Sequence, residues 1–153
     1  MPDCFISHST KDQPLANFVH SELTGHGLDV FLASVSLGPG ERWSETILTN
    51  LKTSSWVIFL ASKAACQSAY VQQEFGIALG LNKKLIPVIW DITILDLPGW
   101  LNHFQALDLR GATLKQIQAR IFDIAQTIKQ DKEQGAFIAG ALILGLLYFG
   151  SRS

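Results

Sequence analysis

The sequence predicts an α/β domain built on a doubly wound parallel sheet. Short apolar runs alternate along the chain with stretches whose apolar residues recur every three or four positions, which is the pattern of strands followed by helices. The run at residues 56–61 contains no polar side chain, as expected of a strand covered on both faces. Crossovers in such a sheet are right-handed, and functional groups gather beyond the carboxyl ends of its strands.

The predicted elements follow from this alternation. Asp12 is expected to cap the first helix, which has Pro14 in its first turn and stops at the glycines at 25 and 27. Strands are expected at residues 4–6, 28–32, 56–61, 85–90 and 106–109, and later helices at about 43–52, 68–81 and 113–134. The inner stripe of the last helix is expected to hold Leu114, Ile117, Ile121, Ile124 and Ile128.

Two connecting segments lack periodicity. Residues 33–42 contain Gly38-Pro39-Gly40 and are expected to form a long loop, because two glycines around a proline resist regular structure. Residues 91–105 are expected to be irregular.

Composition narrows the classes of function. The 153 residues suffice for one domain with an appendage, and a net charge of -1 with only 16% charged residues argues against a nucleic-acid binder. Cys4 and Cys66 provide neither a metal spacing nor a disulfide framework, so we expect a buried Cys4, a free thiol at Cys66 and a reducing compartment. The four histidines are scattered without ligand spacing, so no metal site is expected.

Several common site motifs are missing. The sequence has no Walker phosphate loop, no dinucleotide fingerprint and no nucleophile elbow. A phosphoacceptor receiver would carry acidic residues after the first strand, where Ser7, His8 and Ser9 stand instead. His8 is expected to be an exposed loop histidine rather than a catalytic base.

Glu74 is the main candidate for chemistry. It lies on the helix expected at residues 68–81, and Tyr70 precedes it by one turn. A carboxylate beside an aromatic ring at a cleft can stabilise a developing positive charge, although a glutamate on a helix can also be simply solvated.

Six short segments follow one another along the chain in the order, and at the intervals, that are typical of one protein family. Together they resemble a Toll/interleukin-receptor (TIR) domain of the bacterial kind, over about residues 3–130. They are CFISHSTKD at 4–12, LDVFL at 28–32, LGPGERW at 37–43, VIFLAS at 57–62, SxYVxxE at 68–74 and LIPV at 85–88.

The resemblance implies a five-stranded flavodoxin-like sheet and an enzyme activated by self-assembly. Many bacterial TIR domains cleave the nicotinamide–ribose bond of NAD+, as substrate rather than cofactor, to ADP-ribose or a cyclic isomer, and Glu74 matches their catalytic glutamate. Residues 33–42 match the BB loop through which these domains assemble. This implies a role in anti-phage or stress immunity, with nucleotide-pocket candidates Ser7, His8, Ser36 and Tyr70.

The sequence keeps a second function open. Another branch of the family acts as non-catalytic signalling adaptors through homotypic assembly, and in these the glutamate can be structural. Two departures bear on this choice: many relatives carry an acidic residue where Ala33-Ser34 stands, and some have Trp in place of Tyr70.

Residues 135–150 form a separate apolar segment after the domain at residues 1–134. They account for nearly all of the positive mean hydropathy, +0.23. The uncharged run at 134–151 would span about 27 Å as a helix, close to the bilayer core, and small residues at spacings of four would allow such helices to pair. We expect a single-pass anchor in the inner membrane or, alternatively, an oligomerisation helix in a soluble assembly.

The charges on either side of this segment suggest its orientation. Lys129 and Lys132 precede it and Arg152 follows, which favours a cytoplasmic domain by the positive-inside rule. No charged leader followed by an apolar stretch is visible at the N-terminus, which is consistent with a cytoplasmic domain.

Overall fold

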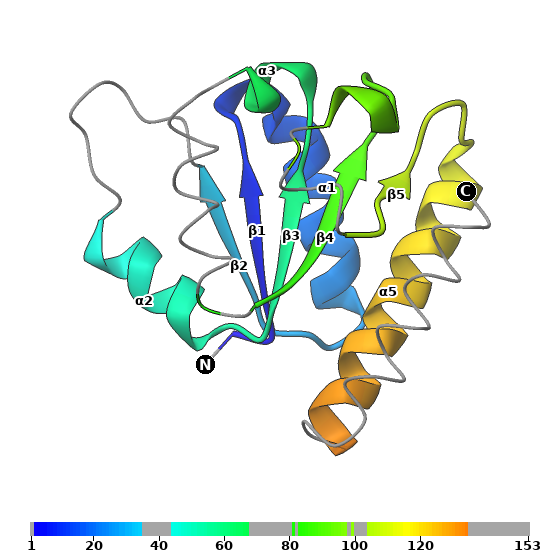
Figure 1. Ribbon diagram of the computed structural model, residues 1–153. Coiled ribbons are helices and arrows are strands. Elements are labelled where there is room, and N and C mark those ends of the chain that lie inside the picture. The colour runs from blue at the N-terminus through cyan, green and yellow to red at the C-terminus, as the bar shows by residue number, and fades with distance from the viewer. Residues whose placement is uncertain are drawn as a thin grey trace.

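The domain is a five-stranded parallel sheet with helices on both faces (Figure 1). The structure is a computed structural model that describes residues 2–34, 44–67, 81, 83–97, 99 and 104–134. The strand order is β2-β1-β3-β4-β5, and every neighbouring pair is parallel, which confirms the predicted doubly wound sheet. The strands are Cys4–His8 (β1), Val30–Ser34 (β2), Trp56–Leu60 (β3), Lys84–Ile89 (β4) and Leu107–Asp108 (β5).

The helices lie between the strands, as predicted, with some displaced boundaries. α3 begins at Lys63, because Ser62 caps it directly after β3. The helix expected at 68–81 lies outside the described residues, apart from Leu81, and stays a prediction. α2 starts behind the cap Ser44 rather than at Trp43, which lies outside the described residues. The described helices are Thr10–Asp12 (η1), Gln13–Gly25 (α1), Glu45–Thr53 (α2), Lys63–Cys66 (α3), Ile94–Asp96 (η2) and Leu114–Gln134 (α5).

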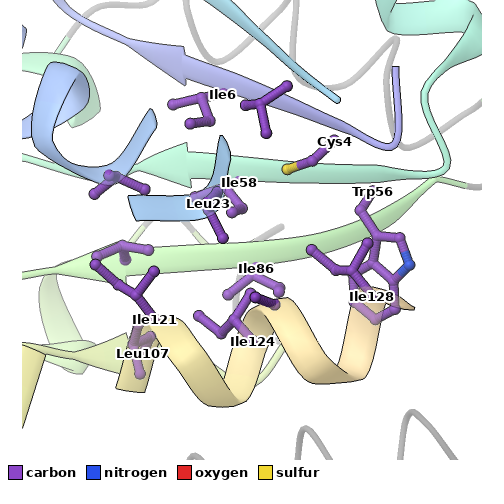
Figure 2. Close-up of a cluster of buried hydrophobic side chains, with 14 of the residues drawn as sticks. Cys4, Ile6, Leu23, Trp56, Ile58, Ile86, Leu107, Ile121, Ile124 and Ile128 are labelled. Atoms are coloured by element: carbon purple, nitrogen blue, oxygen red, sulfur yellow. The ribbon is translucent and has the colours of Figure 1, made fainter. Parts of the chain in front are cut away.

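Alternation along the strands divides the core into two layers. Cys4 and Ile6 of β1 face α1 and α5, whereas Phe5 faces α2 and α3. Figure 2 shows the first layer, where Ile121, Ile124 and Ile128 of α5 point toward the strands. Burial of these apolar residues on both faces of the sheet explains why the central strands carry continuous apolar runs.

Two predictions about helix residues are wrong. Leu114 is 62% exposed, because it is the first residue of α5 and the packed stripe begins one turn later, at Ile117. Asp12 occupies the N-cap position of α1, but its side chain makes no capping hydrogen bond. Its carboxylate instead accepts a hydrogen bond from Ser62.

β2 begins at Val30, two residues later than predicted. Asp29 lies just before the strand and bonds to Asp3. Its backbone N donates to Asp3 Oδ2 at 2.8 Å, and its carbonyl accepts from the backbone N of Asp3 at 2.7 Å. The side chain and backbone of Asp3 thus tie the start of β1 to the turn before β2.

A charged cluster joins the last turns of α5 to the amino edge of the sheet. Trp56 Nε1 donates to Asp131 Oδ2 at 2.8 Å, and the same carboxylate forms an ion pair with Lys84. The Lys84 ammonium also lies 5.3 Å from the centre of the Trp56 ring. Asp131 is only 6% exposed, so its charge depends on these partners.

The predicted membrane segment is not covered by the structure. Residues 135–150 lie outside the described residues. Among the helices that are described, none combines the length and the apolar character that crossing a bilayer requires.

We expect Asp131→Ala to lower the free energy of unfolding by about 3 kcal/mol, because it leaves Lys84 and the Trp56 indole N–H without their shared partner. Urea denaturation of the full chain measures this loss. Lys132→Ala is the control: it removes a neighbouring pair with Asp3 in which Lys132 is 64% exposed, and should cost less than about 1 kcal/mol. Equal losses for the two variants would contradict the role of the buried cluster.

Candidate active site

The candidate site is the carboxyl edge of the sheet between β1 and β3. The strand order places β2 on one side of β1 and β3 on the other, so the chain leaves β1 and β3 in opposite directions. Such a switch point is where open α/β sheets bind ligands. The residues at this edge are Ser7 and His8 at the end of β1, Ser9 just after it, and Ala61, Ser62 and Lys63 after β3.

Ser7 is fully buried between β2 and β3. It pairs with Ala33 on one side and Phe59 on the other, and it is 0% exposed. Its Oγ has no hydrogen-bond partner within the described part of the chain, an arrangement that costs about 1–3 kcal/mol for a buried polar group.

His8 is a buried strand residue, so the expectation of an exposed loop histidine is wrong. β1 extends two residues beyond the apolar triplet at 4–6, and the start of α1 covers the imidazole, which leaves His8 1% exposed. His8 Nε2 lies 3.0 Å from Gln13 Oε1, and the Gln13 amide donates onward to Asn17 Oδ1 at 2.8 Å. Because an amide oxygen only accepts, Nε2 carries the proton and Nδ1 is left without a partner among the described residues.

Ser7 and His8 are adjacent but face opposite sides of the sheet. Ser7 shares its face with Phe5 and therefore with α3, whereas His8 shares its face with Ile6 and bonds to the first residue of α1. Of these two predicted pocket residues, only Ser7 lies on the face to which α3 belongs.

Side chains from three strand ends meet at the start of α3. Ser62 Oγ donates to Asp12 Oδ2 at 2.5 Å and accepts from the backbone N of Ala65 at 3.1 Å. From the other side, the backbone N of Lys63 donates to Asp91 Oδ1 at 3.0 Å. The segments after β1, β3 and β4 are therefore linked at one point.

The sequence analysis did not assign these contacts. Asp12 was expected to cap the first helix, and no role was predicted for Ser62 or Asp91. The available signal was position, because each of these residues follows a predicted strand and the carboxyl ends of parallel strands share one edge. Only the strand order shows that Asp12 and Ser62 come from neighbouring strands.

The remaining predicted site residues lie outside the described part of the chain. These are Ser36, Tyr70 and Glu74. Their assignment therefore stays a prediction. Within the described residues, no group of three or more His, Cys, Asp or Glu side chains could hold a metal ion.

Cys66 is the last residue of α3 and is half-buried. Burial, and next the carboxylates of Asp91 and Asp96, raise the pKa of the Cys66 thiol to about 11. Burial likewise raises the pKa of the Cys4 thiol well above its usual range. Both cysteines are therefore protonated at neutral pH, and for Cys66 this argues against thiolate chemistry at the carboxyl edge.

The chain belongs to the TIR-domain family, whose model matches residues 4–121. A probable 2′ cyclic ADP-D-ribose synthase from Brachypodium distachyon is 29% identical over 97 residues, covering 62% of this chain and 43% of that protein. The chain thus spans less than half the length of this curated relative.

Two solved structures share the fold. The TIR domain of a Toll-related receptor from Hydra magnipapillata superposes with a TM-score of 0.64 at 20% identity, over 84% of this chain and 99% of that one. A metazoan TIR-STING receptor from C. gigas, in complex with 2′,3′-cGAMP, gives a TM-score of 0.65 at 24% identity, over 84% of this chain and 39% of that one. The five-stranded flavodoxin-like sheet implied by the resemblance is confirmed.

We expect iodoacetamide to alkylate Cys66 at pH 8 about 100 times more slowly than a thiol of ordinary pKa, because a pKa of about 11 leaves so little thiolate. Mass spectrometry of the folded full chain, with a short cysteine peptide as the control, measures the rates. Alkylation of Cys66 as fast as that of the peptide would contradict the assigned protonation.

Proposed function

We propose that this TIR domain cleaves the nicotinamide–ribose bond of NAD+, with Glu74 as the catalytic carboxylate. The observation that carries the proposal is the family membership combined with the match of residues 68–74 to the family's catalytic segment. The name of the plant relative, a probable 2′ cyclic ADP-D-ribose synthase, supports the same chemistry.

Two described carboxylates at the start of α3 already accept hydrogen bonds from the protein, so the proposed reaction calls for a further carboxylate. Asp12 accepts from Ser62, and Asp91 accepts from the backbone N of Lys63. Glu74 is eight residues beyond Cys66, the last residue of α3 as described.

The proposed reaction needs one negative charge near the ribose. When the glycosidic bond breaks, its electron pair stays on the ring nitrogen of nicotinamide, which departs neutral and leaves an oxocarbenium-like ribose. The Glu74 carboxylate stabilises this cation or traps it briefly as an ester. Attack by water then gives ADP-ribose and a proton, whereas attack by an adenine nitrogen or ribose hydroxyl of the same molecule gives a cyclic isomer and a proton.

We also propose that four further residues line the nucleotide pocket, namely Ser7, His8, Ser36 and Tyr70. Ser7 is supported by its position on the α3 face and its free hydroxyl. His8 has less support, because its imidazole faces α1 and is fixed by Gln13.

Self-assembly is the proposed means of activation, through the segments at residues 33–42 and 135–150. The loop expected at 33–42 begins later than predicted, because Ala33 and Ser34 belong to β2, and residues 35–42 lie outside the described residues. A bacterial anti-phage or stress response is the setting that the resemblance suggests. The second candidate function is a non-catalytic adaptor that acts through the same loop. It is favoured by one neighbour in fold, the heterodimer of the RPS4 and RRS1 TIR domains, which shares 12% identity with this chain.

Glu74→Gln should lower kcat for NAD+ by about 100-fold or more, because the amide keeps the shape of the side chain and removes its charge. Chromatography of nicotinamide and nucleotide products from the assembled full chain measures this and separates hydrolysis from cyclisation. Glu45→Gln makes the same change at an exposed position on α2 and should keep the wild-type rate.

Equal turnover by wild type and Glu74→Gln would contradict the catalytic role. The absence of NAD+ loss under every assembly condition, with signalling abolished by substitution of Pro39 but not of Glu74, would support the adaptor instead.

We also propose that residues 135–150 anchor the domain in the inner membrane, with residues 1–134 in the cytoplasm. The full chain should then sediment with membranes and require detergent for release. Leu144→Lys should shift it toward the soluble fraction, because a lysine at the centre of a span costs about 3 kcal/mol of insertion free energy. If the wild-type full chain is soluble without detergent and behaves like Leu144→Lys, the membrane anchor is contradicted. That result would favour an oligomerisation helix.

A further inference from the structure

The start of α3 is held from two sides by carboxylates that belong to other elements. Asp12, at the end of η1, bonds to Ser62, and Asp91, just after β4, bonds to the backbone N of Lys63. We call these two contacts the α3 brace. The brace is built from side chains far apart in sequence, since 50 residues separate Asp12 from Ser62 and 28 separate Lys63 from Asp91.

Asp12 makes this contact in place of a local one. An aspartate at an N-cap position ordinarily accepts from the backbone N–H groups of its own helix. Here the Asp12 carboxylate makes no such bond and is directed at Ser62. Its orientation therefore serves the start of α3 rather than the start of α1.

Ser62 depends on this partner. It is 0% exposed, and its hydroxyl oxygen already accepts from the backbone N of Ala65 as the cap of α3. The hydroxyl hydrogen points to Asp12, so the carboxylate also fixes the direction in which the oxygen lone pair meets the helix. Without Asp12 the Ser62 hydroxyl hydrogen would be buried without this acceptor.

We propose that Asp12 is a positioning residue for NAD+ cleavage, acting through Ser62. This inference rests on the proposed function. Twelve residues separate Ser62 from Glu74, so the brace sets the position and direction at which the chain enters the catalytic segment. Because Asp12 follows β1 by four residues, it also ties the start of α3 to the strand end that carries Ser7.

Positioning of this kind affects the chemical step more than binding. A displacement of about 1 Å at a reacting group costs roughly 100-fold in rate. We therefore expect Asp12→Ala to lower kcat for NAD+ by about 10- to 100-fold while KM changes by less than about threefold. Asp12→Asn keeps an oxygen that accepts from Ser62 and should retain most of the wild-type kcat.

The experiment pairs turnover with hydrogen exchange in the full chain. Exchange followed by mass spectrometry reads residues 63–67, where the amides of residues 63, 65, 66 and 67 are bonded to Asp91, Ser62 and Lys63 in this structure. We expect them to exchange about tenfold faster in Asp12→Ala than in wild type or Asp12→Asn.

Ser44→Ala is the matched control. It removes the serine cap of α2, whose Oγ accepts from the backbone N of Ile47 at 3.2 Å, a bond that involves none of the residues of the brace. Ser44→Ala should lower the melting temperature about as much as Asp12→Ala does. It should leave exchange at residues 63–67 and kcat for NAD+ unchanged.

Three outcomes would overturn the inference. They are unchanged exchange at residues 63–67 in Asp12→Ala, faster exchange there with unchanged kcat, and a loss of kcat in Asp12→Asn as large as in Asp12→Ala. Failure of the proposed function looks different: wild type would then show no NAD+ turnover, Asp12 would have no catalytic role, and exchange alone would decide whether the brace holds α3.

Discussion

The reversal of chain direction between β1 and β3 is the constraint on which the site depends. From β1 the chain crosses by α1 to β2, and from β3 it crosses in the opposite direction toward β4. Right-handed crossovers that run in opposite directions must lie on opposite faces of the sheet. The segments that follow β1 and β3 therefore diverge, and the polar residues at these two strand ends are left side by side.

Those polar residues must be paired within the protein or with a ligand. Asp12 and Ser62 bond to each other across the switch point, and Asp91 completes the link from β4. Ser7 Oγ and His8 Nδ1 are the buried side-chain atoms in the described residues that find no partner. The opposite edge contrasts with this, because there Trp56, Lys84 and Asp131 satisfy one another. Within the described residues, the two buried side-chain atoms without a partner therefore both lie at the carboxyl edge.

Local sequence patterns predicted the strands and helices whose positions depend on the burial of apolar side chains. The strands, their parallel pairing and the inner stripe of α5 from Ile117 onward follow from period and run length. The errors at His8 and Asp12 concern polar residues whose partners lie in another helix or at the end of another strand. His8 is polar and follows an apolar triplet, yet α1 covers it. Asp12 stands at a cap position, yet a serine 50 residues away receives its carboxylate. No local pattern records such a partner, because it exists only once the strand order is fixed.

The central claim is that the edge between β1 and β3 binds NAD+. Nuclear magnetic resonance of the Glu74→Gln variant tests it most directly, because this variant should bind the nucleotide without consuming it. On addition of NAD+, the account predicts amide shift changes at Ser7, Ser9 and Lys63, with those of Trp56 and Lys84 at the amino edge unchanged. Binding that shifts only the amino-edge amides, or no change at either edge at saturating NAD+, would contradict the account.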